Sequence, residues 1–372
     1  MNPTFPATRC VAFRTDASLA IGTGHVMRCL TLANALKARQ VTCHFICRDL
    51  PGQLIDAIRR RGHEAHVLPE SEMATPATDD AQEPAHAGWL TTDWRTDAEQ
   101  TLALLEMLRP EWLVVDHYAL DARWQNATRP GYGRLFVIDD LADRPHAADL
   151  LLDQNLGREA RDYAALVPST CELLIGPQYA LLRPEFAEYR EASLARRERP
   201  SLGNILITMG GIDKDNATGR VLEALESCPL PSHCKLSVVM GANAPWLASV
   251  QAQALEMPWE TEVAVNVNDM ARRMSQADLA IGAAGSTSWE RCCLGVPSLT
   301  IILAENQRKI AEMLDRAGIA VSLGEIDQLT YLSEHWAKVT HPEALKGMSS
   351  SAAQITAGQG ARHVSSHLMI NS

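Results

Sequence analysis

A histidine directly after two closely spaced glycines is the clearest chemical signal in this 372-residue chain. Gly22, Gly24 and His25 follow a short apolar run and precede apolar residues at helical spacing, which predicts a strand, a glycine loop and a helix. The glycines allow the backbone to approach a ligand closely, and the start of a helix presents unpaired N–H groups. Because free imidazole has a pKa of about 6.5, a histidine at this junction can accept a proton from water at neutral pH.

The glycine loop by itself leaves two interpretations open. It lacks the third glycine of a dinucleotide-binding loop, since Met27 stands in that place, and it lacks the Lys-Ser/Thr ending of a P-loop. A structural turn whose histidine caps the helix or packs in the core would have the same sequence. The choice between a catalytic site and a turn therefore depends on the rest of the chain.

A second loop, in residues 281–295, offers groups suited to a diphosphate. Gly285, Ser286 and Thr287 leave backbone N–H groups open, supply two hydroxyl groups and lead into an expected helix. Glu290, about one turn further on, could accept hydrogen bonds from a pair of ribose hydroxyls, or it could simply stabilise the helix dipole. The sequence therefore predicts an anion-binding loop here, with two explanations for its glutamate.

Polar side chains also follow several expected strands, and in parallel sheets ligands bind beyond the carboxyl ends of the strands. Tyr118 and Asp139 lie at such ends, as His25 does, so their convergence favours a site there. Asp139 and Asp140 could simply cap a helix or form a turn, and we favour that explanation. Asp116 could equally fix the geometry of its loop.

Short apolar strands alternate with helical segments along the whole chain, and this alternation positions the groups above. The expected strands are 11–13, 41–47, 65–68, 113–116, 135–139, 150–153, 173–175, 204–208, 236–240, 262–265, 279–281 and 298–303. Strands that are apolar on both faces and separated by helices predict an α/β protein with doubly wound parallel sheets. A strand–glycine–helix pattern restarts at Asn204, which predicts two similar domains in tandem.

Two other segments stand apart from this alternation. The charged, proline-ended run Tyr189–Ser201 is the best candidate boundary, so we expect domains at 1–195 and 196–372. Pro69–Ala87 is rich in Pro, Ala, Asp and Glu and is expected to be a mobile surface loop. From about Leu329 the tail is expected to be helical or mobile, without chemistry of its own.

Composition narrows the range of partners and compartments. The net charge of −11 argues against nucleic-acid and anionic-membrane partners, which require a basic surface. Nine scattered cysteines without C-x-x-C pairs argue against a zinc site or a disulfide framework and favour a reduced, cytoplasmic setting. The chain opens without a signal-peptide pattern, and no apolar run approaches the roughly 20 residues that span a bilayer.

Five segments together resemble a known enzyme family. They are RTDASLAIGTGHVMRCLTLA (14–33), DHY (116–118), AGSTSWE (284–290), LGVP (294–297) and ENQ (305–307). In combination they are similar to the hydrolases that act on a UDP-linked 2,4-diacetamido-2,4,6-trideoxy-altrose in pseudaminic acid biosynthesis. The resemblance covers most of residues 10–325, whereas residues 69–87 and the tail beyond about 325 lie outside it.

The resemblance implies a GT-B fold, with two Rossmann-like doubly wound parallel-sheet domains facing across a cleft. It implies hydrolysis at the anomeric carbon with inversion, no metal and no cofactor, His25 as general base, and Tyr118 and Asn306 as catalytic residues that hold the sugar or the water. The C-terminal domain would bind UDP. The implied substrate-binding residues are Arg14, Asp16, Gly22, Gly24, Gly285, Ser286, Thr287, Glu290 and Gln307.

Two other functions remain open at this point. A GT-B glycosyltransferase would carry the same loops but pass the sugar to an acceptor other than water. A non-catalytic nucleotide-sugar sensor would bind without turnover. The sequence fixes neither the acetamido sugar that is accepted nor the oligomeric state, for which a monomer is the working expectation.

Overall fold

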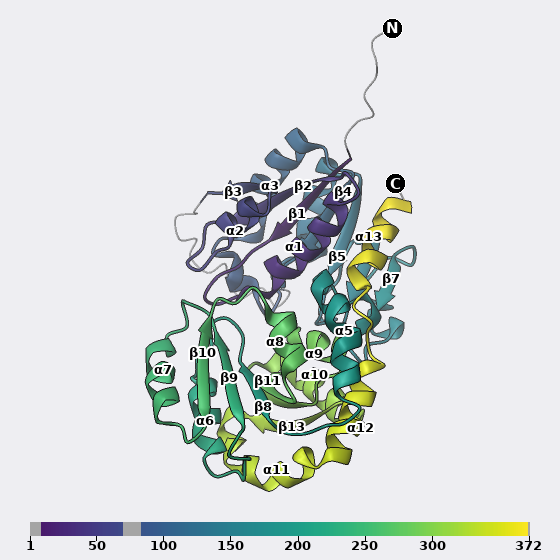
Figure 1. The fold of residues 1–372 in the computed structure, drawn as a ribbon. Helices are drawn as coiled ribbons and strands as arrows, with labels where there is room; N and C mark the ends of the chain where they lie inside the picture. Colours follow the sequence, from purple (N-terminus) through teal and green to yellow (C-terminus); the bar gives the residue numbers. More distant parts are fainter. Residues whose placement is uncertain (1–8, 70–82, 371–372) are drawn as a thin grey trace. The chain divides into compact units, whose positions relative to one another are not determined.

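The computed structural model describes residues 9–69 and 83–370 and divides the chain into two compact units. Unit 1 comprises residues 1–181 and 361–372, and unit 2 comprises residues 182–360. Each unit contains its own parallel sheet with helices packed against it (Figure 1). The α/β class and the two Rossmann-like sheets expected from the sequence are confirmed.

Unit 1 is built on a seven-stranded parallel sheet of order β3-β2-β1-β4-β5-β6-β7. Its strands are β1 (Cys10–Thr15), β2 (Thr42–Arg48), β3 (Glu64–Leu68), β4 (Trp112–Asp116), β5 (Arg134–Ile138), β6 (Leu150–Asp153) and β7 (Glu172–Ile175). Its helices are α1 (Gly24–Lys37), α2 (Ile55–Arg60), α3 (Trp94–Leu108), α4 (Ala122–Thr128) and α13 (Gly360–Ile370), with 3₁₀ turns η1 (Ala87–Leu90), η2 (Arg129–Gly131), η3 (Ala160–Tyr163) and η4 (Pro177–Tyr179). The strand order reverses between β1 and β4, which is where doubly wound sheets bind ligands.

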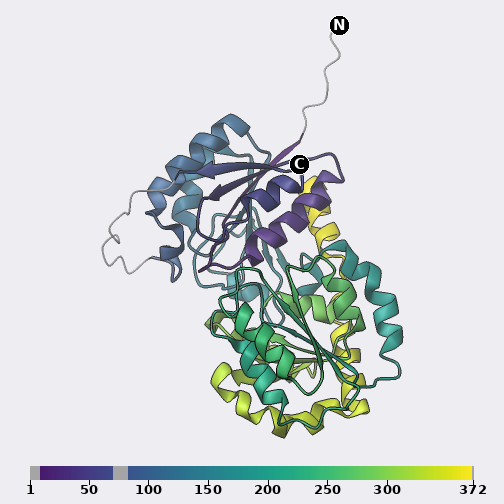
Figure 2. The same ribbon diagram turned by 60° about the vertical axis from the view of Figure 1, so that its left-hand side comes forward.

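Helices cover both faces of this sheet. One apolar cluster joins the sheet to α1 and α13, and another joins it to α3 and the β4–α4 region. Val364 and Leu368 of α13 belong to the same cluster as α1, and Trp112 Nε1 donates to the Leu368 carbonyl oxygen at 3.1 Å. Figure 2 shows α13, in yellow, beside the purple α1. The end of the chain therefore completes the core of unit 1.

Unit 2 is built on a six-stranded parallel sheet of order β10-β9-β8-β11-β12-β13. Its strands are β8 (Asn204–Thr208), β9 (Lys235–Met240), β10 (Glu260–Val265), β11 (Leu279–Ala283), β12 (Ser298–Ile302) and β13 (Ala320–Glu325). Its helices are α5 (Pro184–Arg196), α6 (Ala217–Leu225), α7 (Leu247–Glu256), α8 (Met270–Gln276), α9 (Thr287–Cys293), α10 (Glu305–Arg316), α11 (Leu332–Thr340) and α12 (Pro342–Ala353), with η5 (Ile326–Tyr331). Here the order reverses between β8 and β11.

The division into units differs from the boundary expected at 195/196. Residues 189–196 form the second half of α5, which belongs to unit 2. Their charge does not indicate a linker, because Arg190 donates to the carbonyl oxygens of Cys293, Ala353 and Thr356 within the same unit. The sequence shows that a residue is charged, but it does not show whether that side chain faces solvent or pairs with buried carbonyl groups.

The loop and the tail are only partly described by the structure. Most of the segment expected as a mobile loop, residues 70–82, lies outside the described residues. Its end is ordered, because η1 begins at Ala87 and buries Leu90. The tail is helical, as expected. Within the described ranges, no helix is long and apolar enough to cross a membrane.

Candidate active site

His25 lies at the start of α1, directly beyond the carboxyl end of β1. Gly22 has φ = +80°, a conformation that side chains disfavour, and its N–H donates to the Ser18 carbonyl oxygen at 2.8 Å. The Ser18 hydroxyl oxygen accepts two further loop N–H groups. This loop is therefore held by its own hydrogen bonds. At the first turn of α1, Thr23 makes no side-chain cap and no acidic residue is present, which leaves N–H groups of the helix open to a ligand.

The imidazole of His25 is oriented by a buried carboxylate. His25 Nδ1 lies 2.6 Å from Asp116 Oδ1, and Asp116 is the last residue of β4, the strand that pairs with β1. A carboxylate only accepts hydrogen bonds, so Nδ1 carries the proton and Nε2 is left as the basic nitrogen. The same arrangement orients the general base in Ser-His-Asp hydrolases.

Arg28 keeps that carboxylate charged. Its Nε and Nη2 atoms donate to the two oxygens of Asp116 at 2.6 and 2.7 Å. Burial alone would raise the pKa of Asp116, but the positive charge of Arg28 and the hydrogen bonds from Arg28 and His25 hold that pKa far below its usual value. Arg28 stands three residues after His25, so the two share one helix face. That spacing was the signal that could have identified Arg28 from the sequence.

Tyr118 packs against His25, as the convergence of strand ends predicted. Their rings meet edge to face, with centroids 4.5 Å apart. The Tyr118 hydroxyl donates to Asp140 Oδ2 at 2.6 Å, and Arg28 Nη1 donates to the same oxygen, also at 2.6 Å. Burial, with the nearby charge of Asp140, raises the pKa of Tyr118 well above its usual value, so the phenol stays neutral. Asp140 thus holds Tyr118 and Arg28 together beneath the histidine.

Two aromatic side chains that the sequence analysis missed complete this cluster. Trp89 of η1 stacks on Tyr118 with centroids 5.5 Å apart, and it meets His25 edge to face at 6.0 Å. His86 lies against Trp89 and Tyr118, with centroids 4.4 and 5.5 Å away. His86 lies at the end of the segment expected to be a mobile loop, and Trp89 follows directly after that segment. No local pattern marks them, because their contacts are with residues distant in the sequence.

Arg14 and Asp16 do not reach the surface. Both side chains are fully buried, and Arg14 pairs with Asp16 at 2.8 Å and with Asp97 at 2.7 Å. Asp16 also accepts the backbone N–H of Arg48 at 2.7 Å. These contacts hold the two side chains at the carboxyl end of β1. Their predicted role in substrate binding stays a prediction.

Asp139 follows the structural explanation that we favoured. It is fully buried and accepts the Ala142 N–H at 2.8 Å, Arg144 Nη1 at 2.8 Å and the Tyr163 hydroxyl at 2.9 Å. These bonds fix the turn after β5. Its neighbour Asp140 points instead to the His25 cluster, so adjacent aspartates serve different purposes.

In unit 2 the predicted loop residues gather at the carboxyl ends of β11 and β12. Ser286 is exposed, and Gly285 and Thr287 are half-buried. Gln307, near the start of α10, lies beside Gly285, because a Cβ atom on that glycine would be 3.8 Å from Gln307 Nε2. Asn306 is exposed next to it. The structure thus places His25 and Tyr118 together in unit 1 and Asn306 with the anion-binding loop in unit 2.

Two ionisable groups beneath this loop have shifted pKa values. Burial raises the pKa of Glu290 to about 7, despite the positive charges of Arg183 and Arg291. A carboxylate whose main role was to stabilise the helix dipole would have a lowered pKa, so that explanation is weakened. Burial lowers the pKa of Arg291 to about 10, which leaves it charged at neutral pH.

Arg291 is a further residue that was not singled out from the sequence. It is 1% exposed, and its Nη2 atom donates to the Ala283 carbonyl oxygen at 2.8 Å and to Ser288 Oγ at 2.9 Å. Its Nη1 atom has no hydrogen-bond partner among the described residues. A buried positive charge that forms no ion pair with the described carboxylates therefore lies under the loop, which favours an anion above it.

Comparison with solved structures identifies the fold. The structure of MurG from Acinetobacter baumannii superimposes with a TM-score of 0.68 at 16% identity and covers 97% of this chain and 99% of that one. The fold is therefore GT-B, the arrangement of two Rossmann-like domains found in nucleotide-sugar glycosyltransferases. No family model matches the chain.

Curated proteins that are similar in sequence include the following two. The UDP-2,4-diacetamido-2,4,6-trideoxy-beta-L-altropyranose hydrolase of Campylobacter jejuni is 27% identical over 311 residues, which covers 84% of this chain and 98% of that protein. The spore coat polysaccharide biosynthesis protein SpsG of Bacillus subtilis is 33% identical over 149 residues, 40% of this chain and 43% of that protein. The resemblance stated from five short segments is thus matched by a similarity that extends over most of the chain.

Proposed function

We propose that this chain is a UDP-sugar hydrolase that cleaves the anomeric C–O bond of a UDP-linked 2,4-diacetamido-2,4,6-trideoxy-L-altrose. The fold and the similarity to the Campylobacter hydrolase support a nucleotide-sugar-processing enzyme. The observation that carries the finer assignment is the His25–Asp116 pair, which leaves Nε2 of a histidine as a base at the ligand-binding edge of the sheet.

The proposed reaction is a single displacement by water. Nε2 of His25 accepts a proton from water as its oxygen bonds to the anomeric carbon, and the C–O bond to UDP breaks with its electron pair leaving on the phosphate. Attack on the face opposite UDP inverts the anomeric configuration. Asp116 stabilises the imidazolium that forms, and general-base assistance of this kind contributes about 10²–10⁴ in rate.

Unit 2 is proposed to hold the nucleotide. The N–H groups after β11 and the hydroxyls of Ser286 and Thr287 are donors for the diphosphate, and the charge of Arg291 beneath them stabilises the negative charge that develops on the leaving UDP. Glu290 is proposed to accept hydrogen bonds from the ribose hydroxyls. In this proposal the N–H groups, the hydroxyls and the buried charge of Arg291 stabilise the leaving diphosphate, a role that a metal ion has in other enzymes.

The sugar is proposed to contact the aromatic cluster beside His25. A 2,4,6-trideoxy sugar with two acetamido groups presents three methyl groups, and Trp89 and Tyr118 offer a stacked apolar surface next to the base. The Tyr118 oxygen, which donates its proton to Asp140, keeps a lone pair for a hydroxyl or amide of the substrate. Asn306 is proposed as a second polar contact to the sugar or the water.

A GT-B glycosyltransferase, which would pass the sugar to an acceptor, is the second candidate, because solved structures that share the fold include a glycosyltransferase. Incubation of the chain with the UDP-sugar alone separates the two functions. The hydrolase should release free sugar and UDP in equal amounts without an acceptor, as followed by proton NMR, and the first sugar signal should have the inverted anomeric configuration. Absence of free sugar until an acceptor is added would establish the transferase instead.

A further inference from the structure

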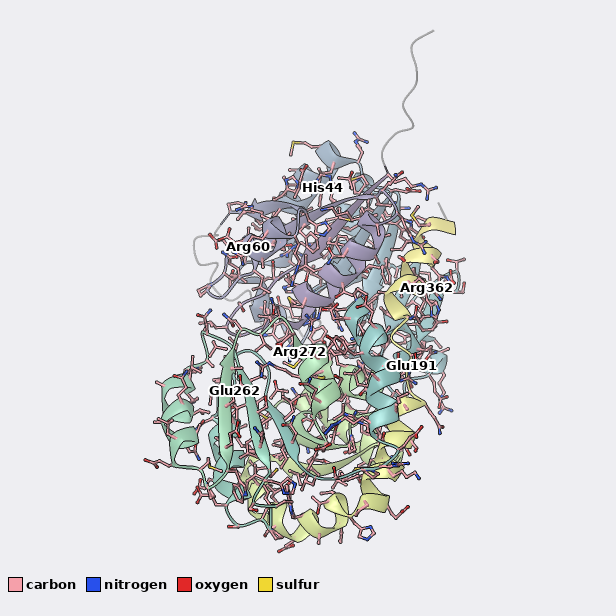
Figure 3. The ribbon with its side chains drawn as sticks, in the orientation of Figure 1. His44, Arg60, Glu191, Glu262, Arg272 and Arg362 are labelled. Carbon is pink, nitrogen blue, oxygen red and sulfur yellow. The ribbon has the colours of Figure 1, made fainter. Side chains whose placement is uncertain are left out.

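Three potential metal ligands meet on the β2–β3 side of unit 1, away from the site described above. His44 lies on β2, and Glu64 and His66 lie on β3, where His44 is paired with Glu64 and Ile46 with His66. Alternate residues of a strand share a face, so all three side chains lie on the same face of the sheet. His44 is labelled in Figure 3 within unit 1. Among the residues that the structure describes, this is the one group of three such side chains whose ligand atoms lie this close together.

The distances match the corner spacing of a tetrahedral metal site. His44 Nδ1 lies 3.1 Å from His66 Nε2 and 3.3 Å from Glu64 Oε2, and all three ligand atoms lie within 4.8 Å of one another. Tetrahedral Zn²⁺ with bonds of about 2.0–2.2 Å separates neighbouring ligand atoms by about 3.3–3.6 Å. Small side-chain rotations are enough to bring the three atoms onto one ion.

Hydrogen bonding within the cluster leaves one contact unsatisfied. His44 Nδ1 faces the Glu64 carboxylate oxygen, which only accepts, and the His66 ring nitrogen, which donates or accepts according to its tautomer. If Nδ1 is protonated, its single proton is shared between the two. If Nδ1 is unprotonated, its lone pair faces the carboxylate directly. A divalent cation removes this conflict, because it accepts the lone pairs of both rings and of the carboxylate together.

We propose that His44, Glu64 and His66 bind a divalent ion of the Zn²⁺ type. Two imidazoles and one carboxylate are a donor set that Zn²⁺ prefers, with a fourth position left for water. Glu64 is 68% exposed and His44 11% exposed at the side chain, so the ion can enter from solvent and be held at a buried ligand. The expectation that the chain has no zinc site came from its nine scattered cysteines, and none of them is among these three ligands.

The site serves stability and not the reaction. β3 is the edge strand of the sheet, and the ligands tie it to β2. His44 stands four residues before Arg48, the last residue of β2, which places it about 13 Å from the carboxyl edge where His25 lies. The ion should therefore raise the melting temperature of unit 1 without changing turnover, and this inference stands whether or not the proposed hydrolase activity is correct.

The test uses the full chain without an affinity tag, titrated with Co²⁺ and followed by its visible absorption, and with Zn²⁺ followed by calorimetry. We expect one equivalent to bind with the intense d–d bands of tetrahedral Co²⁺. Glu64→Gln and His66→Gln should each weaken binding by more than about tenfold and abolish the Zn²⁺-dependent rise in melting temperature. His363→Gln, at an exposed histidine of α13, is the matched control and should bind as the parent chain does.

Two results would overturn the proposal. One is that the parent chain shows no saturable binding of either ion. The other is that Glu64→Gln and His66→Gln bind like His363→Gln, which would locate any bound metal elsewhere. Glu64 is largely exposed, so Glu64→Gln is the variant that keeps the fold if His66→Gln loses stability, and melting temperatures measured in EDTA identify that case.

Discussion

Asp116 determines which nitrogen of His25 carries its proton. Its own charge is fixed by two hydrogen bonds from Arg28, and Arg28 is fixed in turn by Asp140. One histidine is therefore supported by three charged residues from α1, β4 and the turn after β5. The sequence indicates the histidine but suggests only a loop role for Asp116, because the contact joins residues 91 positions apart.

Glu290 is a residue whose charge changes with pH near neutrality. With a pKa of about 7 in the ligand-free protein, it is half ionised at pH 7. If both ribose hydroxyls donate to the carboxylate, binding favours its ionised form. Nucleoside affinity should then increase as pH rises through about 7.

Calorimetry with uridine, which carries no phosphate to titrate, measures this dependence. The parent chain should bind more tightly at pH 8 than at pH 6. Glu290→Gln should bind with an affinity that does not change between the two pH values, and Glu290→Ala should bind several-fold more weakly at both. If Glu290→Ala and the parent chain bind uridine with equal affinity, Glu290 does not contact the ribose and its role is structural.

At the scale of elements, the strands that carry the site were predictable and their partners were not. Apolar runs located β1, β4, β11 and β12 because strands buried on both faces are apolar throughout. β13 was missed because it is an edge strand in which only Ala320 and Leu323 are buried. The spacing of Val364 and Leu368 indicates a helix, but no local pattern shows that α13 packs in unit 1.

The junction between β11 and α9 depends on a glycine that has no room for a side chain. A Cβ atom on Gly282 would contact Arg291 Nη1 and lie 2.7 Å from the Thr208 carbonyl oxygen on β8. Gly282→Ala should therefore displace Arg291 or the strand, lower the stability of the protein by about 1–3 kcal/mol and weaken UDP binding.

Gly347→Ala is the matched control for this substitution. Gly347 is exposed in α12, and no atom lies within 4 Å of a Cβ built on it. Alanine there should be neutral or stabilise the helix by up to about 1 kcal/mol. Urea unfolding and UDP calorimetry on the two variants distinguish the cases, and a Gly282→Ala protein that matches Gly347→Ala in both would show that Arg291 does not depend on this contact.

At the scale of the whole molecule, the chemistry is divided between two units. The candidate base and the aromatic cluster belong to unit 1, and the loop for the diphosphate with its buried arginine belongs to unit 2. Both groups follow strands at the reversal of strand order in their own sheet. Because each loop lies at the ligand-binding position of its own sheet, we assign the two loops to one proposed reaction.

The rate of acceptor-free sugar release by His25→Asn tests the central claim most directly. Asparagine at this position retains a donor for Asp116 and lacks Nε2, so the surrounding network is preserved. We expect kcat, followed by proton NMR, to fall by about 10²–10⁴-fold while the affinity for UDP measured by calorimetry stays near that of the parent chain. A His25→Asn protein that releases sugar at the parent rate would contradict the central claim.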